Sequence, residues 1–149
     1  MIEFKNVSKV YDNGSVALDD VCLTINDGEF VLICGHSGAG KSTLFKLLTH
    51  EVVPDSGTVI VDDFDVTRMK RSKIPKLRRK LGVVFQDFRL LPNKTVSENI
   101  AFALEVIEEK PKIIKEKVSH VLELVGLSDK ANDLPEDLSG GEQQRVAIA

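Results

Sequence analysis

The fold class of this chain is decided by the stretch Gly35-His36-Ser37-Gly38-Ala39-Gly40-Lys41-Ser42. The stretch fits the pattern G-x-x-x-x-G-K-[ST], in which glycines let successive backbone N–H groups face one anion. A nearly continuous apolar run at 29–34 precedes it and predicts a strand buried on both faces. Leucines at helical spacing follow it and predict a helix over 41–50. Strand, glycine-rich loop and helix in this order are the context that a phosphate-binding loop requires.

The side chains of this loop fit a nucleotide phosphate and its magnesium ion. Lys41 supplies a mobile cation for the β- and γ-phosphates, and the Ser42 hydroxyl is a hard oxygen ligand for Mg²⁺. Thr43 can add a hydrogen bond to phosphate. An ordinary glycine-rich turn is the alternative, but it would require both the pattern and its flanks to arise by chance. The predicted phosphate-binding residues are Gly35, His36, Ser37, Gly38, Ala39, Gly40, Lys41, Ser42 and Thr43.

A second glycine-rich stretch, Ser139-Gly140-Gly141-Glu142-Gln143, follows Leu138. Ser139 and Glu142 have the spacing of a capping box, which predicts that a helix starts here. Glycine costs a helix up to about 1 kcal/mol per residue, and a cap does not need it. Bare N–H groups at a helix start do suit a nearby anion. Taken alone, these residues fit a second phosphate-binding helix terminus and an ordinary capped helix equally well.

The composition excludes several classes of protein. With 149 residues, 42% hydrophobic and 29% charged, the chain is typical of a globular domain. A net charge of −3 argues against a globally basic nucleic-acid binder. Cys22 and Cys34 lie in apolar runs and are predicted to be buried, reduced thiols. No apolar run is long enough to span a membrane and no signal peptide opens the chain. We therefore expect a cytoplasmic protein that reaches the membrane through a partner.

The remaining pattern predicts a β-rich beginning and a helical end. Strands are expected at 2–7, 16–26, 58–61 and 81–85, and helices at 95–107 and 112–125. Asn13 and Gly14 are expected to supply positive φ angles to a turn. Thr95 and Glu98 predict a capping box, and Gly126 predicts a helix end.

Residues 68–80, the basic segment, contain eight lysines and arginines and no acidic residue. Such a run is most often a solvated surface. Contact with anionic lipid headgroups or with an acidic loop of a membrane partner is the alternative. Nucleic acid is a weaker candidate, because no aromatic residues are interleaved with the charges.

These motifs together resemble the first two thirds of an ATP-binding subunit of the ABC transporter family. The resemblance implies an α/β P-loop NTPase of ABC type that binds and hydrolyses ATP with Mg²⁺. In that fold, residues 1–87 would form an antiparallel β subdomain and part of a RecA-like core. Residues 88–149 would form a helical subdomain, and the core strands expected after residue 149 would be missing.

The resemblance also implies roles for residues outside the phosphate loop. Tyr11 matches the aromatic side chain that stacks on adenine, although it could be a simple turn residue. Gln86 matches the glutamine that contacts Mg²⁺ and the attacking water and reports to a membrane subunit, although it could merely end a strand. The stretch 138–143 matches the signature motif, which contacts ATP held by the other copy in a head-to-tail homodimer.

Within the family, the stretches 1–4, 37–40, 84–92 and 95–99 resemble the cell-division subfamily of FtsE type. That subfamily implies an integral-membrane partner of FtsX type, regulation of septal cell-wall hydrolysis, and a place on the inner face of the plasma membrane. Lipoprotein-releasing and macrolide-exporting ATPases are the close alternatives. None of these readings involves nucleic acid.

Hydrolysis in this family also uses an aspartate and a glutamate on a later strand, and a later histidine. No residue of this chain matches them, and Asp62, Asp63 and Asp87 do not follow the required apolar pattern. Without the strands between them, the runs 29–34 and 81–85 would face an empty slot. They would then pair directly, exchange strands between copies, or belong to a longer polypeptide. The 149 residues alone are expected to bind nucleotide weakly and to hydrolyse almost none.

Overall fold

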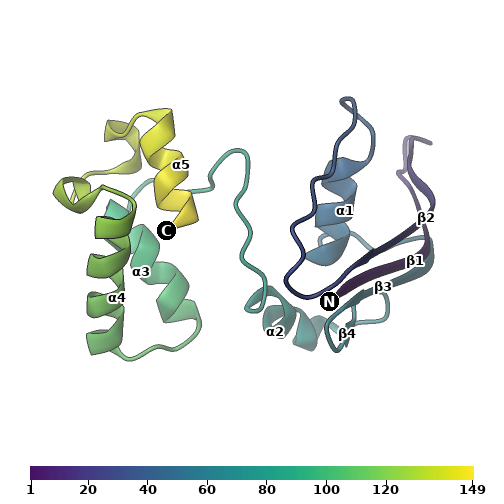
Figure 1. The fold of residues 1–149 in the computed structure, drawn as a ribbon, viewed down its shortest axis with the longest axis horizontal. Helices are drawn as coiled ribbons and strands as arrows, with labels where there is room; N and C mark the ends of the chain where they lie inside the picture. The colour runs from purple at the N-terminus through teal and green to yellow at the C-terminus, as the bar shows by residue number, and fades with distance from the viewer. The chain divides into compact units, whose positions relative to one another are not determined.

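The computed structural model describes all residues from Met1 to Ala149, in two compact units (Figure 1). The first comprises Met1–Gly82 and the second Val83–Ala149. The sequence-based division placed this boundary between residues 87 and 88. Each unit has its own hydrophobic core, and each is described by itself.

The first unit is built on a four-stranded antiparallel sheet in the order β2-β1-β3-β4. The strands are β1 (Ile2–Val10), β2 (Val16–Ile25), β3 (Ser56–Val61) and β4 (Phe64–Asp65). The helical elements are α1 (Lys41–Leu48), the 3₁₀ turn η1 (Arg71–Lys73) and α2 (Ile74–Arg78). The strands predicted at 2–7, 16–26 and 58–61 and the helix predicted after the glycine-rich loop are therefore confirmed.

One face of this sheet is buried beneath α1 and α2. Phe4 and Val59 of the sheet share one buried cluster with Leu47 of α1 and Leu77 of α2. Strict alternation in β1 would place residue 6 on the same face as Phe4, yet the next buried residue is Val7. Asn6 has a φ of 49°, and the pairing register shifts between Phe4 and Val7. This bulge returns Val7 to the core.

Two strand predictions are wrong, one in the first unit and one at the boundary between the units. The runs 29–34 and 81–85 form no strands and belong to no sheet. Phe30 is 93% exposed and Leu32 is 76% exposed. The physical reason is that a strand needs a neighbouring strand to pair its backbone N–H and C=O groups. Neither run has such a neighbour in the sheet of this chain.

The cysteine and turn predictions also need correction. Cys22 and Cys34 are free thiols, as predicted, but both are exposed. Cys22 follows Val21 in β2, where Val21 and Leu23 pack against the core, so residue 22 points to the opposite face. Cys34 belongs to the run that did not form a strand. In the turn after β1 only Gly14 has a positive φ, of 78°, because the Asn13 side-chain oxygen instead accepts a hydrogen bond from the Ser15 N–H.

The second unit is helical. Its elements are α3 (Val96–Val106), α4 (Pro111–Leu124), η2 (Ser128–Lys130), η3 (Pro135–Asp137) and α5 (Gly140–Ile148). The predicted capping box at Thr95 is present, and Gly126 ends α4 with a φ of 66°. Val118 and Leu122 of α4 are buried with Val96 and Ile100 of α3, as the apolar periodicity predicted. No helix in the structure has the length and apolar character needed to cross a membrane.

Candidate nucleotide site and signature helix

The glycine-rich loop of the first unit leads directly into α1. Gly38 and Gly40 have φ angles of 83° and 84°, in the left-handed region that favours glycine. Gly40 stands at the N-cap of α1, where no side chain caps the helix and no acidic residue lies in the first turn. The positive end of the helix is therefore not neutralised by the protein itself.

Gly40 is required by space as well as by its backbone angles. A Cβ atom added at this residue would lie 2.2 Å from the Ala17 carbonyl oxygen and 3.0 Å from a Leu18 methyl group. Ala17 and Leu18 belong to β2, so this strand lies too close to the end of the loop to leave room for a side chain there. The sequence motif marks the glycine, but it gives no sign that β2 is what excludes a side chain there.

The backbone of the loop offers unpaired donors. The N–H groups of Gly38, Gly40, Lys41 and Ser42 make no hydrogen bond within the protein. The Ala39 N–H, in contrast, donates to the His36 carbonyl oxygen at 3.2 Å. Unpaired donors gathered at a helix N-terminus are suited to an anion.

The Lys41 ammonium is held close to the same loop. Its Nζ donates to the carbonyl oxygens of Gly35 at 2.7 Å and of His36 at 2.8 Å. Carbonyl oxygens are weaker partners for an ammonium than phosphate oxygens are, so a phosphate can replace them. The Ser42 side chain is exposed and makes no hydrogen bond to the protein, which leaves its hydroxyl free to ligate a metal ion. His36, Ser37 and Ala39 are exposed at the rim of the loop.

Tyr11 lies beside the beginning of α1. Its hydroxyl group is 3.2 Å from the Thr43 Oγ1 atom, and Thr43 is buried in the first turn of α1. Asp55 fixes the preceding end of β1 by accepting hydrogen bonds from the Val10 N–H at 2.6 Å and the Lys9 ammonium at 2.9 Å. These two donors hold the pKa of the Asp55 carboxyl below its usual value. The structure thus brings Tyr11 together with the glycine-rich loop, and Asp55 is a supporting residue that the sequence did not reveal.

The signature stretch forms the start of α5 in the second unit. Glu142 accepts hydrogen bonds from the Ser139 hydroxyl at 2.5 Å and the Ser139 N–H at 2.7 Å. These bonds, together with the charges of Lys130 and Arg145, hold the pKa of Glu142 below its usual value. The Gln143 amide donates to the carbonyl oxygens of Pro135 at 2.9 Å and Leu138 at 3.1 Å. The predicted capping box is therefore confirmed, and Gln143 anchors the helix start to the preceding turn.

Gly140 and Gly141 occupy open space. A Cβ atom at either residue would meet nothing within 4 Å, and neither residue has a positive φ. Their N–H groups make no hydrogen bond within the protein. The fold itself therefore gives no reason for glycine at these two residues.

The start of α3 shows what a helix terminus without a ligand looks like in the same unit. Thr95 and Glu98 form a capping box at this helix start. The Val96 N–H donates to the Asp133 carbonyl oxygen, and the Ser97 N–H donates to the Ala131 carbonyl oxygen, each at 2.9 Å. The first two amides of α3 are thus satisfied by the protein, whereas the first two amides of α1 and of α5 make no hydrogen bond within it.

Gln86 is exposed in the second unit and makes no hydrogen bond. The two residues Phe88 and Arg89 have φ angles of 56° and 50°, so the loop after Gln86 turns sharply in the left-handed region. The Arg89 guanidinium lies 3.8 Å from the centre of the Phe85 ring and bridges the two sides of this loop. Gln86 and residues 139–143 belong to the second unit, whereas the phosphate loop and Tyr11 belong to the first.

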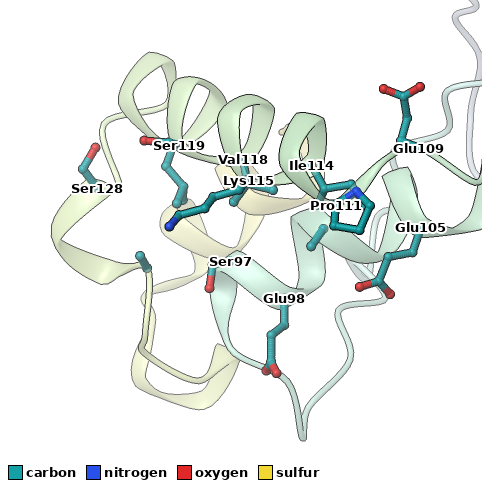
Figure 2. A pocket seen from close by; sticks show the side chains of 13 residues that line it. Ser97, Glu98, Glu105, Glu109, Pro111, Ile114, Lys115, Val118, Ser119 and Ser128 are labelled. Atoms are coloured by element: carbon teal, nitrogen blue, oxygen red, sulfur yellow. The ribbon is translucent and has the colours of Figure 1, made fainter.

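The second unit also contains a groove between α3 and α4 (Figure 2). Its volume is about 670 Å³, and apolar side chains from both helices form its floor, among them Ala101 and Ile114. The carboxylates of Glu98, Glu105 and Glu109 and the ammonium of Lys115 line its edge. No cluster of three or more His, Cys, Asp and Glu side chains that could hold a metal ion occurs in the structure.

Comparison with known proteins identifies the family. Residues 18–149 match the family described as ABC transporter. The chain belongs to this family. Its whole length is 54% identical to the cell division ATP-binding protein FtsE of Bacillus subtilis, of which it spans 65%. It is 47% identical over 152 residues to a methionine import ATP-binding protein, MetN 1, of Bacillus thuringiensis subsp. konkukian, of which it spans 45%.

Solved structures agree with this family assignment. The dimeric structure of a post-hydrolysis state of the ATP-binding cassette MJ0796 bound to ADP and Pi superposes with a TM-score of 0.90 at 37% identity. The match covers 99% of this chain and 67% of that one. The fold is therefore that of an ABC ATP-binding cassette, with the antiparallel sheet that the resemblance implied. The chain spans about two thirds of the length of the FtsE proteins that it matches.

Proposed function

We propose that this chain provides the nucleotide-binding part of an ATP-hydrolysing subunit in a bacterial ABC complex of FtsE type. The observation that carries the proposal is the loop before α1, where four N–H groups make no hydrogen bond within the protein and the Lys41 ammonium contacts the loop beside an uncapped helix terminus. Such a site fits the β- and γ-phosphates of ATP. Identity to FtsE proteins over the whole chain supports the subtype.

Each predicted site residue then has a chemical role. The loop from Gly35 to Thr43 holds the phosphates, and Tyr11 stacks on the adenine. Ser42 and Gln86 hold Mg²⁺, which neutralises phosphate charge when it is bound. Gln86 also positions the attacking water.

We propose that the signature stretch serves a second copy of the chain. Residues 139–143 would contact the γ-phosphate of ATP bound by the partner copy in a head-to-tail homodimer. Two observations support this. Gly140 and Gly141 have unpaired N–H groups in open space, and a structural relative with nucleotide products bound is dimeric.

The membrane partner would be an integral-membrane subunit of FtsX type, with this protein on the inner face of the plasma membrane. The output would be regulation of septal cell-wall hydrolysis. The groove between α3 and α4 suits a partner helix with apolar and basic residues, because its floor is apolar and three of its four charged edge residues are acidic. Glu105→Lys should therefore weaken binding to the partner and leave nucleotide affinity in solution unchanged.

A lipoprotein-releasing or macrolide-exporting ATPase is the alternative, and it uses the same nucleotide site. Purified complexes would separate the alternatives. Co-purification with an FtsX-type protein supports the division role, and co-purification with an exporter subunit contradicts it.

The proposed binding of ATP is tested by titrating a fluorescent ATP analogue with Mg²⁺ into the wild-type protein and into Lys41→Ala. We expect saturable binding that weakens at least about tenfold in the variant, because a charge-assisted contact to phosphate is lost. Residues 1–149 alone should show negligible turnover, since no residue matches the catalytic acids of the family. Equal affinity of the two proteins would contradict the assignment of the loop.

A further inference from the structure

The basic segment is an exposed surface of the first unit that the nucleotide site does not use. It comprises η1, α2 and the residues on either side of them. All eight of its basic residues are exposed: Arg68, Lys70, Arg71, Lys73, Lys76, Arg78, Arg79 and Lys80. None of the thirteen residues of the segment is acidic, so the positive charge is not diluted along it.

Only two of these eight side chains contact a polar or aromatic partner outside the segment. The Arg78 Nε donates to the Thr49 carbonyl oxygen at 3.0 Å. The Lys80 ammonium lies 3.9 Å from an Asp62 carboxylate oxygen and 5.4 Å from the centre of the Phe64 ring. The remaining six form no ion pair. They keep their charge available for a ligand.

The segment is nevertheless firmly attached to the fold. Leu77 of α2 is completely buried in the core of the first unit, and Met69 packs against the same core. The basic side chains are therefore attached to a backbone segment that packs against the core of the first unit. Because the chain has a net charge of −3 and this segment alone carries +8, the rest of the chain carries −11. A negatively charged planar surface would therefore attract this segment rather than the acidic remainder of the chain.

We propose that the basic segment binds anionic lipid headgroups directly, in addition to any contact with a membrane protein. The six unpaired side chains are long and exposed, which suits a laterally mobile layer of phosphate groups. Single-stranded nucleic acid fits less well, because the segment offers no aromatic side chain for base stacking. The attraction is short-ranged at physiological salt, so it acts once the segment is close to the membrane.

The proposal is tested by flotation of the purified full-length protein with vesicles, in the absence of any membrane protein. One set consists of phosphatidylcholine alone, and the other of two parts phosphatidylcholine to one part phosphatidylglycerol. We expect binding to the second set only, with release as NaCl rises from about 0.05 M to about 0.5 M. The triple variant Lys70→Gln, Lys73→Gln and Lys76→Gln should bind about 100-fold more weakly, since each cation near the surface contributes about fivefold.

Two matched triple variants serve as controls, one for the change in net charge and one for the replacement of the three lysines. Lys46→Gln, Lys110→Gln and Lys112→Gln change the net charge equally at exposed lysines outside the segment and should bind as the wild type does. Lys70→Arg, Lys73→Arg and Lys76→Arg preserve the charge and should also keep binding. Equal binding to both vesicle types, insensitivity to salt, or equal losses in the two glutamine triples would overturn the proposal. So would tighter binding to a mixed-sequence oligonucleotide than to the anionic vesicles. None of these outcomes bears on ATP binding, which is measured without lipid.

Discussion

The glycines of the two units stand at helix starts for different reasons. Gly40 of the first unit has a φ of 84° and faces the Ala17 carbonyl oxygen so closely that a Cβ atom would lie 2.2 Å from it. Gly140 and Gly141 of the second unit have ordinary φ angles and open space around them. The first glycine is required by its own chain, whereas the other two are not.

This difference distinguishes a glycine that the fold requires from glycines that only a bound ligand would require. Glycine lowers the stability of a helix, so glycines that nothing in the fold requires call for an external reason. The unpaired N–H groups of Gly140 and Gly141 point to an anion that another molecule supplies. Four predictions test this comparison, ordered by their expected effect on the free energy of unfolding.

Gly40→Ala should have the largest effect. It places a residue with a Cβ atom in the left-handed region and against β2, so we expect a loss of about 2–4 kcal/mol in the free energy of unfolding, together with loss of nucleotide binding. Urea denaturation and nucleotide titration measure both. Gly38→Ala is the matched control, because its φ is 83° but its Cβ atom would meet nothing within 4 Å. It should cost only about 1 kcal/mol, and equal losses in the two variants would contradict the role given to β2.

Ser139→Ala should come next, with a loss of about 1 kcal/mol, because the cap of α5 disappears. Ser42→Ala in the first turn of α1 is the counterpart. Its hydroxyl caps nothing, so the free energy of unfolding should stay within about 0.5 kcal/mol of the wild type. The same variant should weaken nucleotide binding in a Mg²⁺-dependent manner. A large loss of stability in Ser42→Ala would show that its hydroxyl serves the fold.

Glu142→Gln should have a smaller effect that depends on pH. Because the folded pKa of Glu142 lies below its unfolded value, the carboxylate contributes stability above about pH 4.3. That contribution is lost as the pH falls through the lower folded pKa. Denaturation curves should therefore show the wild type as more stable at neutral pH and equal to the variant in acid. A difference that persists or grows in acid would have the wrong sign for this account.

Much of this architecture could be predicted from local patterns. The glycine-rich loop, the two capping boxes and the apolar face of α4 depend on neighbours in the sequence, and the structure contains all of them. The runs 29–34 and 81–85 were predicted as strands because they are apolar, yet a strand also depends on a hydrogen-bonded neighbour that the run itself does not encode. Cys34 was predicted to be buried because it ends the run 29–34, and it is exposed because that run forms no strand.

The candidate site shows the same division. The motif marked Lys41 and Gly40, but the contact of Gly40 with Ala17 and the fixing of β1 by Asp55 depend on residues distant in the sequence. No pattern of neighbouring residues in the sequence predicts either contact.

The central claim is tested most directly by Gly140→Ala combined with Gly141→Ala in the full-length protein, with thermal unfolding and ATP turnover measured on the same sample. The account predicts opposite changes. The free energy of unfolding should stay equal or rise by about 0.5 kcal/mol, since alanine favours the helix and meets no atom. ATP turnover and nucleotide-dependent dimerisation should fall by at least about tenfold, because two Cβ atoms would then stand where the partner's phosphate must approach. Unchanged turnover with unchanged or higher stability would contradict the claim that these glycines serve a ligand outside their own chain.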